Sequence, residues 1–232
     1  MFSGKIEDYI LFEDKEIIVC RKPAGIAVQN ARIGAMDLES SLKNYLAMQD
    51  GGGRRIPYLA VIHRLDQPVE GILVFGKTPE AAKSLSAQIT AGKMEKIYLA
   101  VTYGKQAEAG KKEKVLEDYL KKDGKSNTSS VVNAHTPGAK KARLSYEVLG
   151  EAVDAISGKK KWLLRIHLDT GRHHQIRVQM AHAGMPLAGD RKYGAGTNDH
   201  RGRQPGSVRR KPYLFPSGNR KGDEIRDKAG RD

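Results

Sequence analysis

One aspartate lies at the end of a short polar run that precedes an apolar stretch. The run His63–Asp66 reads His-Arg-Leu-Asp, and residues 72–75 read Ile-Leu-Val-Phe. Much later in the chain, Thr170–Arg177 reads Thr-Gly-Arg-His-His-Gln-Ile-Arg, a dense set of donors that ends in an arginine. An arginine can hold a carboxylate ionised through charge-assisted hydrogen bonds. Together the two segments favour carboxylate chemistry on a polyanionic substrate.

The composition points to a nucleic acid or another anionic surface as the partner. The chain has 232 residues, with 41 Lys and Arg against 27 Asp and Glu, and a formal net charge of +14. Such an excess attracts polyanions, although a cationic surface that only confers solubility would carry the same charge. At this length the chain can bury a sizeable core, as one large or two small domains.

The residue types exclude several classes of site. The single Cys20 excludes a disulfide framework and a multi-cysteine zinc site, and it fits a reducing compartment. His173 and His174 are adjacent, so in regular structure their side chains should diverge, and no His-Glu-x-x-His pattern occurs. We therefore expect no metal site. No apolar run approaches the roughly 20 residues that span a bilayer, and no signal peptide opens the chain. We expect a cytoplasmic protein without a membrane partner.

Hydrophobic spacing predicts the elements that must position these residues. Alternation predicts a strand at 95–103, in which Tyr98 should face the side opposite to Ile97. The other predicted strands are two short ones within 10–21, joined by a turn at Asp14-Lys15, and further strands at 142–149 and 162–168. Two of the predicted helices lie near 37–48 and near 174–183. A third is expected to begin with Thr78 as its N-cap and Pro79 at its first position, with a buried stripe of Ala82, Leu85 and Ile89.

Two basic regions do not fit this pattern. We expect residues 105–140 to form a long excursion from the sheet, partly ordered by apolar residues between 115 and 120. Residues 195–232 carry ten Lys and Arg against five Asp and Glu, and they hold too few apolar groups to offset their ordering entropy. We therefore expect one domain over 1–194 and a basic, disordered tail over 195–232. The alternative is that Tyr213-Leu214-Phe215 completes an edge of the sheet.

The order and spacing of several motifs resemble those of the RluA-type pseudouridine synthases. The resemblance runs from residue 10 to residue 194. It implies an α+β fold with a mixed, mostly antiparallel sheet core and flanking helices. It also implies that the family's optional N-terminal RNA-binding module is absent, so that target choice comes from the catalytic domain. The matching segments are Ile10–Asp14, Lys22–Gly25, His63–Asp66 with Gly71, Lys96–Ala100, and Thr170–Arg177 continued by Gly184, Pro186, Gly189-Asp190 and Tyr193-Gly194.

The resemblance implies an isomerase that converts uridine to pseudouridine in structured ribosomal or transfer RNA without a cofactor. Asp66 would act beside the sugar and base, as nucleophile or as base. Arg177 would keep Asp66 ionised, and Tyr98 would stack on the uracil ring. The target base must be flipped out, and Arg64 would fill the vacated stack. The other implied substrate-binding residues are His63, Arg172, His174 and Gln175. RNA is the expected partner of a monomer that has no obligatory protein partner.

The sequence departs from the family pattern beside the aspartate and after Gly194. Val69-Glu70 stand where Thr-Ser is usual, His173 where Thr is common, and Gln179 where His is frequent. The family's closing apolar strand and His-Pro turn are not found. A non-catalytic RNA-binding protein on the same fold is therefore the alternative, and an unrelated His-dependent hydrolase is a weaker one. Retention of the aspartate, tyrosine and arginine together favours the enzyme, because a pure binder has no use for that trio.

Overall fold

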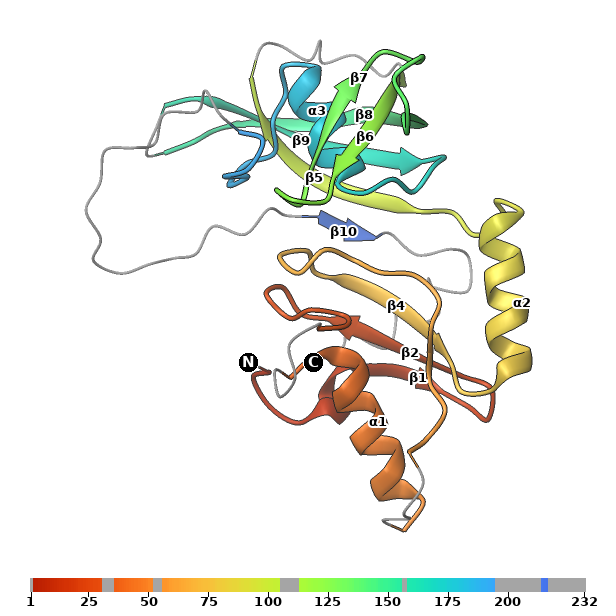
Figure 1. Ribbon diagram of the computed structural model, residues 1–232. Coiled ribbons are helices and arrows are strands. Elements are labelled where there is room, and N and C mark those ends of the chain that lie inside the picture. The colour runs from red at the N-terminus through yellow and green to blue at the C-terminus, as the bar shows by residue number, and fades with distance from the viewer. Residues whose placement is uncertain are drawn as a thin grey trace. The chain divides into compact units, whose positions relative to one another are not determined.

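The chain divides into two units. In the computed structural model one unit contains Met1–Met94 with Phe215–Asp232, and the other contains Glu95–Leu214. The described residues are 2–30, 36–51, 56–104, 113–155, 158–194 and 214–216. The predicted boundary at residue 194 and the predicted disorder of 195–232 stay predictions, because most of that segment lies outside the described residues. Figure 1 shows the elements in chain order, from red at the N-terminus to blue.

The first unit is built on a four-stranded antiparallel sheet. Its strands are β1 (Ile10–Glu13), β2 (Ile17–Lys22), β3 (Ala60–Val61) and β4 (Gly71–Gly76), in the order β1-β2-β4-β3, and a 3-10 helix, η1 (Ile6–Tyr9), precedes them. Asp14 makes the first turn, where its Oδ1 accepts hydrogen bonds from the backbone N–H of Glu16 and Ile17, both at 2.7 Å. β2 buries alternate residues, including Ile18 and Cys20. The predicted pair of strands and their turn are confirmed.

Two helices of this unit begin where the sequence predicts. α1 (Leu38–Gln49) is capped by Asp37, whose carboxylate accepts a hydrogen bond from the Ser40 N–H at 2.8 Å. α2 (Pro79–Thr90) is capped by Thr78, and it lies so close to β4 that a Cβ at Gly76 would come within 2.9 Å of the Ala82 nitrogen. The predicted stripe on α2 is only half-buried, so the prediction that it is buried is wrong.

The second unit holds one helix and five strands of a six-stranded sheet, and the division between the units falls within the sixth strand. Its central strands pair antiparallel, and their inner residues, among them Trp162, Leu164 and Ile166, are almost fully buried. The strands are β5 (Ile97–Tyr103), β6 (Lys114–Asp123), β7 (Thr128–Val132), β8 (Lys140–Val153), β9 (Lys160–Leu168) and β10 (Leu214–Pro216), in the order β10-β5-β9-β8-β6-β7. The helix α3 (Gln175–His182) packs on β6 and β7. Both sheets with their helices confirm the predicted α+β class (Figure 1).

The lysine-rich segment after β5 is where the prediction was wrong. Within residues 113–139, the expected excursion is instead the hairpin β6–β7, which belongs to the sheet and pairs with β8. Its ordering comes from alternate residues of β6 such as Leu120, which is buried with Ala142 and Val178 of α3. Exposed polar residues such as Glu117 and Lys121 stand between them, and they dilute the apolar pattern that marks a strand in the sequence.

The short strand β10 stands beside β5 at the edge of the six-stranded sheet. This agrees with the alternative in which the segment around Leu214 completes a sheet edge. The neighbouring residues 195–213 and 217–232 lie outside the described range. Within the part of the chain that the structure describes, no helix is both long enough and apolar enough to cross a membrane.

Candidate active site

Asp66 lies in the loop that joins β3 to β4. Its backbone carbonyl accepts a hydrogen bond from the Val69 N–H at 2.9 Å, which closes a tight turn. Leu65 and Val69 are buried on either side, so the loop is anchored by its apolar residues. The Asp66 side chain is half-buried and Arg64 is exposed. The departure at Val69 therefore serves packing, because its side chain anchors the turn that carries the aspartate.

A buried lysine fastens this loop to the Lys-Pro-Ala-Gly turn. Lys22 is fully buried, and its Nζ donates hydrogen bonds to the carbonyl oxygens of Ile26 at 2.7 Å and of Pro23 and Gln67 at 3.1 Å. Gly25, at φ +89°, donates its N–H to the Gln67 carbonyl at 2.8 Å. A buried ammonium is costly unless it is hydrogen-bonded, so these contacts fix the residue next to Asp66. The motif was noticed in the sequence, but nothing there indicated that its lysine is buried.

Lys22→Met is expected to destabilise the first unit. The substitution leaves buried carbonyl groups without their donor, each at about 1–3 kcal/mol, so a total loss of about 2 kcal/mol or more should appear in denaturant unfolding. Lys15→Met, at an exposed lysine in the turn before β2, is the matched control and should be close to neutral. Equal stability of the two variants would show that the Lys22 contacts do not hold the loop.

In the second unit, Tyr98 lies on the inner face of β5. It stands opposite Ile166 of β9, and the strand alternation places it on the same face as Ala100 and Thr102, which are fully buried. Ile97 faces the other side, as predicted. Close by, burial lowers the pKa of Lys96, with Arg172 adding to the effect and Asp169 opposing it. Tyr98 itself is half-buried.

The turn before α3 is organised by two buried glutamines. Gln175 Oε1 accepts hydrogen bonds from the Thr170 hydroxyl at 2.8 Å and the Arg172 N–H at 2.9 Å. Its Nε2 donates to the Arg143 carbonyl at 3.0 Å and to Gln179 Oε1 at 2.9 Å. Gln179 Nε2 in turn reaches Asp118 of β6 at 2.8 Å. All four hydrogen-bonding positions of the Gln175 amide are used in this way, which favours a structural role for it over the predicted contact with substrate.

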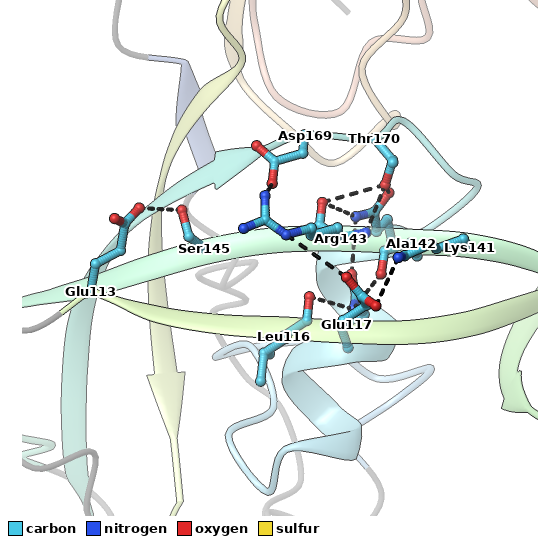
Figure 2. Close-up of polar contacts among 11 residues, drawn as sticks. Glu113, Leu116, Glu117, Lys141, Ala142, Arg143, Ser145, Asp169 and Thr170 are labelled. Atoms are coloured by element: carbon cyan, nitrogen blue, oxygen red, sulfur yellow. Dashed lines mark hydrogen bonds and ion pairs between the residues drawn. The ribbon is translucent and has the colours of Figure 1, made fainter.

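Exposed charged residues lie around this turn. Figure 2 shows Arg143 forming an ion pair with Asp169 and extending toward Glu117, which also binds Lys141 at 2.8 Å. Arg172 is exposed, and its Nε donates a hydrogen bond to the Lys141 carbonyl at 2.8 Å. The predicted substrate contact by Arg172 stays a prediction, and its exposure is compatible with it.

The two adjacent histidines stack on each other. The ring centroids of His173 and His174 lie 3.8 Å apart, so the prediction that the side chains diverge is wrong. The reason is that His174 takes up a left-handed backbone conformation, at φ +53°, where α3 begins. Its Nδ1 is hydrogen-bonded to the Tyr193 hydroxyl at 2.8 Å. A non-glycine residue in this conformation costs of order 1–3 kcal/mol and often marks a functional site.

Arg177 is held by a carboxylate that the sequence did not single out as its partner. Its Nε and Nη2 donate hydrogen bonds of 2.7 Å to the two oxygens of Asp190, and its guanidinium carbon lies 4.9 Å from the centre of the Tyr193 ring. The Asp190 side chain is 1% exposed and that of Arg177 is 13% exposed. Burial raises the pKa of Asp190, but the hydrogen bonds and charge of Arg177, with backbone donors, outweigh it and lower that pKa overall. Arg177 is thus a fixed group in a buried ion pair.

The candidate residues are distributed over both units. His63, Arg64 and Asp66 belong to the first unit, and Tyr98 with the residues 172–177 belongs to the second. Within the second unit, the structure brings His174, Arg177 and Asp190 together around Tyr193. The predicted pairing of Arg177 with Asp66 and the predicted contacts with substrate stay predictions.

A family model described as RNA pseudouridylate synthase matches residues 16–182. The chain is 32% identical over 192 residues to ribosomal large subunit pseudouridine synthase D of Xylella fastidiosa, covering 80% of this chain and 51% of that protein. It is 33% identical over 189 residues to tRNA pseudouridine synthase C of Haemophilus ducreyi, covering 80% of this chain and 73% of that protein. The chain thus spans about half the length of the Xylella relative.

A solved structure shares the fold. The structure of human RNA pseudouridylate synthase domain containing 4 aligns with a TM-score of 0.66 at 22% identity, covering 91% of this chain and 83% of that one. At this identity the likeness concerns the fold alone. The family match over residues 16–182 includes the segments that carry Asp66, Tyr98 and Arg177.

Proposed function

This chain belongs to the RNA pseudouridylate synthase family, and we propose that it is itself an RNA pseudouridine synthase, which isomerises uridine in structured ribosomal or transfer RNA. The observation that carries the proposal is that the family match over 16–182 includes Asp66, Tyr98 and Arg177. The names of the relatives, one a ribosomal and one a tRNA pseudouridine synthase, support RNA of these two classes as the substrate.

Asp66 carries the chemistry in this proposal. The reaction breaks the bond between uracil N1 and the ribose, turns the base, and forms a bond from C5 to the same ribose carbon. The hydrogen at C5 leaves as a proton, and N1 gains one, so the reaction is an isomerisation. A carboxylate beside the sugar and base can act as nucleophile or as proton acceptor. The half-buried position of Asp66 in an anchored loop supports this role.

Other candidate side chains would bring the base to that carboxylate. A base inside a helix must be flipped out before it can react, and we assign the vacated place in the stack to Arg64, which is exposed two residues before Asp66. Tyr98 stacks on the flipped uracil. Arg177 keeps Asp66 ionised while it also holds Asp190, since a guanidinium carries five N–H donors and can serve two carboxylates. His63, Arg172 and His174 contact the substrate around the site.

A non-catalytic RNA-binding protein on the same fold is the competing function. The departure at Val69-Glu70 was its main sequence argument, and the packing role of Val69 accounts for half of that departure. We further propose that the enzyme acts as a cytoplasmic monomer, without a cofactor and without an obligatory protein partner.

Nucleoside analysis after incubation with RNA tests the proposed function. Unmodified transcripts of ribosomal and transfer RNA are incubated with the protein, digested to nucleosides and separated by chromatography. We expect pseudouridine to appear at the expense of uridine, with no change in total pyrimidine. Tight RNA binding without any pseudouridine would favour the non-catalytic protein instead.

A further inference from the structure

The turn end of the β6–β7 hairpin gathers positive charge that its own carboxylate does not balance. Lys122, Lys125, Lys140 and Lys192 are all exposed, and within the described residues no ion pair involves their ammonium groups. Asp123 is the acidic residue of the turn. Its Oδ2 accepts a hydrogen bond from the Ser126 hydroxyl at 2.6 Å and its Oδ1 accepts one from the Lys125 N–H at 2.9 Å. The carboxylate therefore shapes the turn.

The lysines converge from three separate segments. Lys122 stands opposite Ser129, and Lys140 stands opposite Leu120. Because Leu120 packs on Val178 of α3, the strand alternation puts Lys122 and Lys140 on the face of the sheet that carries α3. Lys192 reaches the hairpin turn from after α3, where its Nζ donates to the Asn127 carbonyl at 2.8 Å. Lys121 lies on the opposite face.

The hairpin is also fastened to the segment that carries the candidate site residues. His173 is hydrogen-bonded through Nδ1 to the Ser129 hydroxyl at 2.8 Å and through Nε2 to Asn127 Oδ1 at 3.1 Å. The Tyr193 hydroxyl accepts a hydrogen bond from the Ser129 N–H at 2.8 Å. Asn127 has a left-handed backbone conformation, at φ +50°. These contacts hold the hairpin in a fixed position beside the start of α3.

We propose that the β6–β7 hairpin, with Lys140 of β8 and Lys192 beside it, is a docking arm for the RNA backbone. Lys122, Lys125, Lys140 and Lys192 bind phosphates, and His173 holds the arm in a fixed position relative to the start of α3. Phosphate contacts position a nucleic acid without reading its sequence, and a pre-ordered arm loses less conformational entropy when it binds. The docking arm depends on the proposed function only because RNA is taken as its ligand. It also assigns a role to His173, which departs from the family pattern.

Removal of charge from the arm tests the phosphate contacts. The triple variant Lys122→Gln, Lys125→Gln, Lys140→Gln is titrated with a fluorescein-labelled RNA stem-loop over a series of NaCl concentrations. Each lost phosphate contact should lower the slope of log affinity against log salt by about 0.7–0.9, so the slope falls by about 2–3 and the affinity about tenfold or more. The matched control is Lys15→Gln, Lys83→Gln, Lys93→Gln, which removes the same charge from exposed lysines of the first unit. Lys121→Gln is a second control, on the far face of the hairpin.

The salt dependence of RNA affinity is compared between the arm variant and the two controls. A slope that falls for the arm variant and stays near the parent's for both controls supports the docking arm. An equal fall in both triple variants would mean that only the net charge matters, and an unchanged slope in the arm variant would mean that these lysines do not touch phosphate. Either result overturns the proposal.

A second variant tests the hydrogen bonds from His173 to the hairpin separately from the charge of the lysines. His173→Phe keeps an aromatic ring beside His174 but removes both hydrogen bonds to the hairpin, and no lysine is lost. We expect faster hydrogen exchange at the Ser129 amide and an affinity for the same RNA several-fold below the parent's. Faster exchange with unchanged affinity would show that the His173 hydrogen bonds serve the fold alone. None of these measurements requires turnover, so the arm can fail while the enzyme works, and the reverse.

Discussion

Asp66→Asn is expected to abolish isomerisation while RNA affinity stays within a few-fold of the parent's. The amide has the same shape but cannot act as nucleophile or proton acceptor, so single-turnover conversion should fall about 10³-fold or more. The turn itself should persist, because it depends on the Asp66 backbone carbonyl and on buried Leu65 and Val69. Affinity comes mainly from phosphate contacts elsewhere. Single-turnover kinetics and filter binding on the same RNA measure the two effects.

Glu70→Gln is the matched control for this variant. It removes a half-buried carboxylate from the same loop and should leave most of the activity. Conversion by the Asp66→Asn variant at a rate near the parent's would remove Asp66 from the mechanism.

Arg177→Leu is expected to cause the largest loss of stability. It leaves the Asp190 carboxylate, whose side chain is 1% exposed, without its charged partner. Removing one partner of a buried ion pair typically costs ~3–5 kcal/mol. This loss should lower Tm by about 10 °C. A thermal melt measures this loss. An unchanged Tm would contradict the buried ion pair.

The double variant Arg177→Leu, Asp190→Leu separates the structural role of the arginine from its catalytic one. Replacing both partners by apolar groups leaves no buried charge, so much of the lost stability should return. If Arg177 also keeps Asp66 ionised, isomerisation should stay low in the restored protein. Recovery of stability and activity together would confine Arg177 to holding Asp190.

The ion pair also predicts how stability depends on pH. The pKa of Asp190 in the folded protein lies below its ordinary value of 3.8. The carboxylate therefore contributes its full stabilisation above that value, and the contribution is lost as the pH falls through the lower folded-state pKa. We expect the stability difference between the parent and the double leucine variant to be constant from neutral pH to about 5 and to change only in more acidic solution. A change near pH 7 would point to another group.

Much of the fold could be predicted because local signals agree with the final structure. Thr78 as N-cap and the proline after it mark the start of α2, and the helical spacing of apolar residues marks α1. The strand β5 alternates clearly, so the orientation of Tyr98 within it followed from the sequence. The hairpin β6–β7 was missed because it buries few residues of its own, such as Leu120, and depends on pairing with β8, which is distant in sequence.

The site was predictable in its motifs but not in its contacts. Arg177 was singled out as a carboxylate partner, yet the choice of Asp190 depends on how the turn after α3 folds back. The role of Lys22 depends on its complete burial, which is rare for a lysine. The stacking of His173 on His174 follows from one left-handed residue, which is uncommon outside glycine.

Release of tritium from RNA labelled at uracil C5 tests the central claim most directly. Isomerisation replaces the C5–H bond by a bond to the ribose, so every pseudouridine formed must expel one labelled hydrogen. We expect the parent protein to release label from ribosomal or transfer RNA in step with the pseudouridine formed, and the Asp66→Asn variant to release none. No release by the parent from any cellular RNA would contradict the assignment of this chain as a pseudouridine synthase.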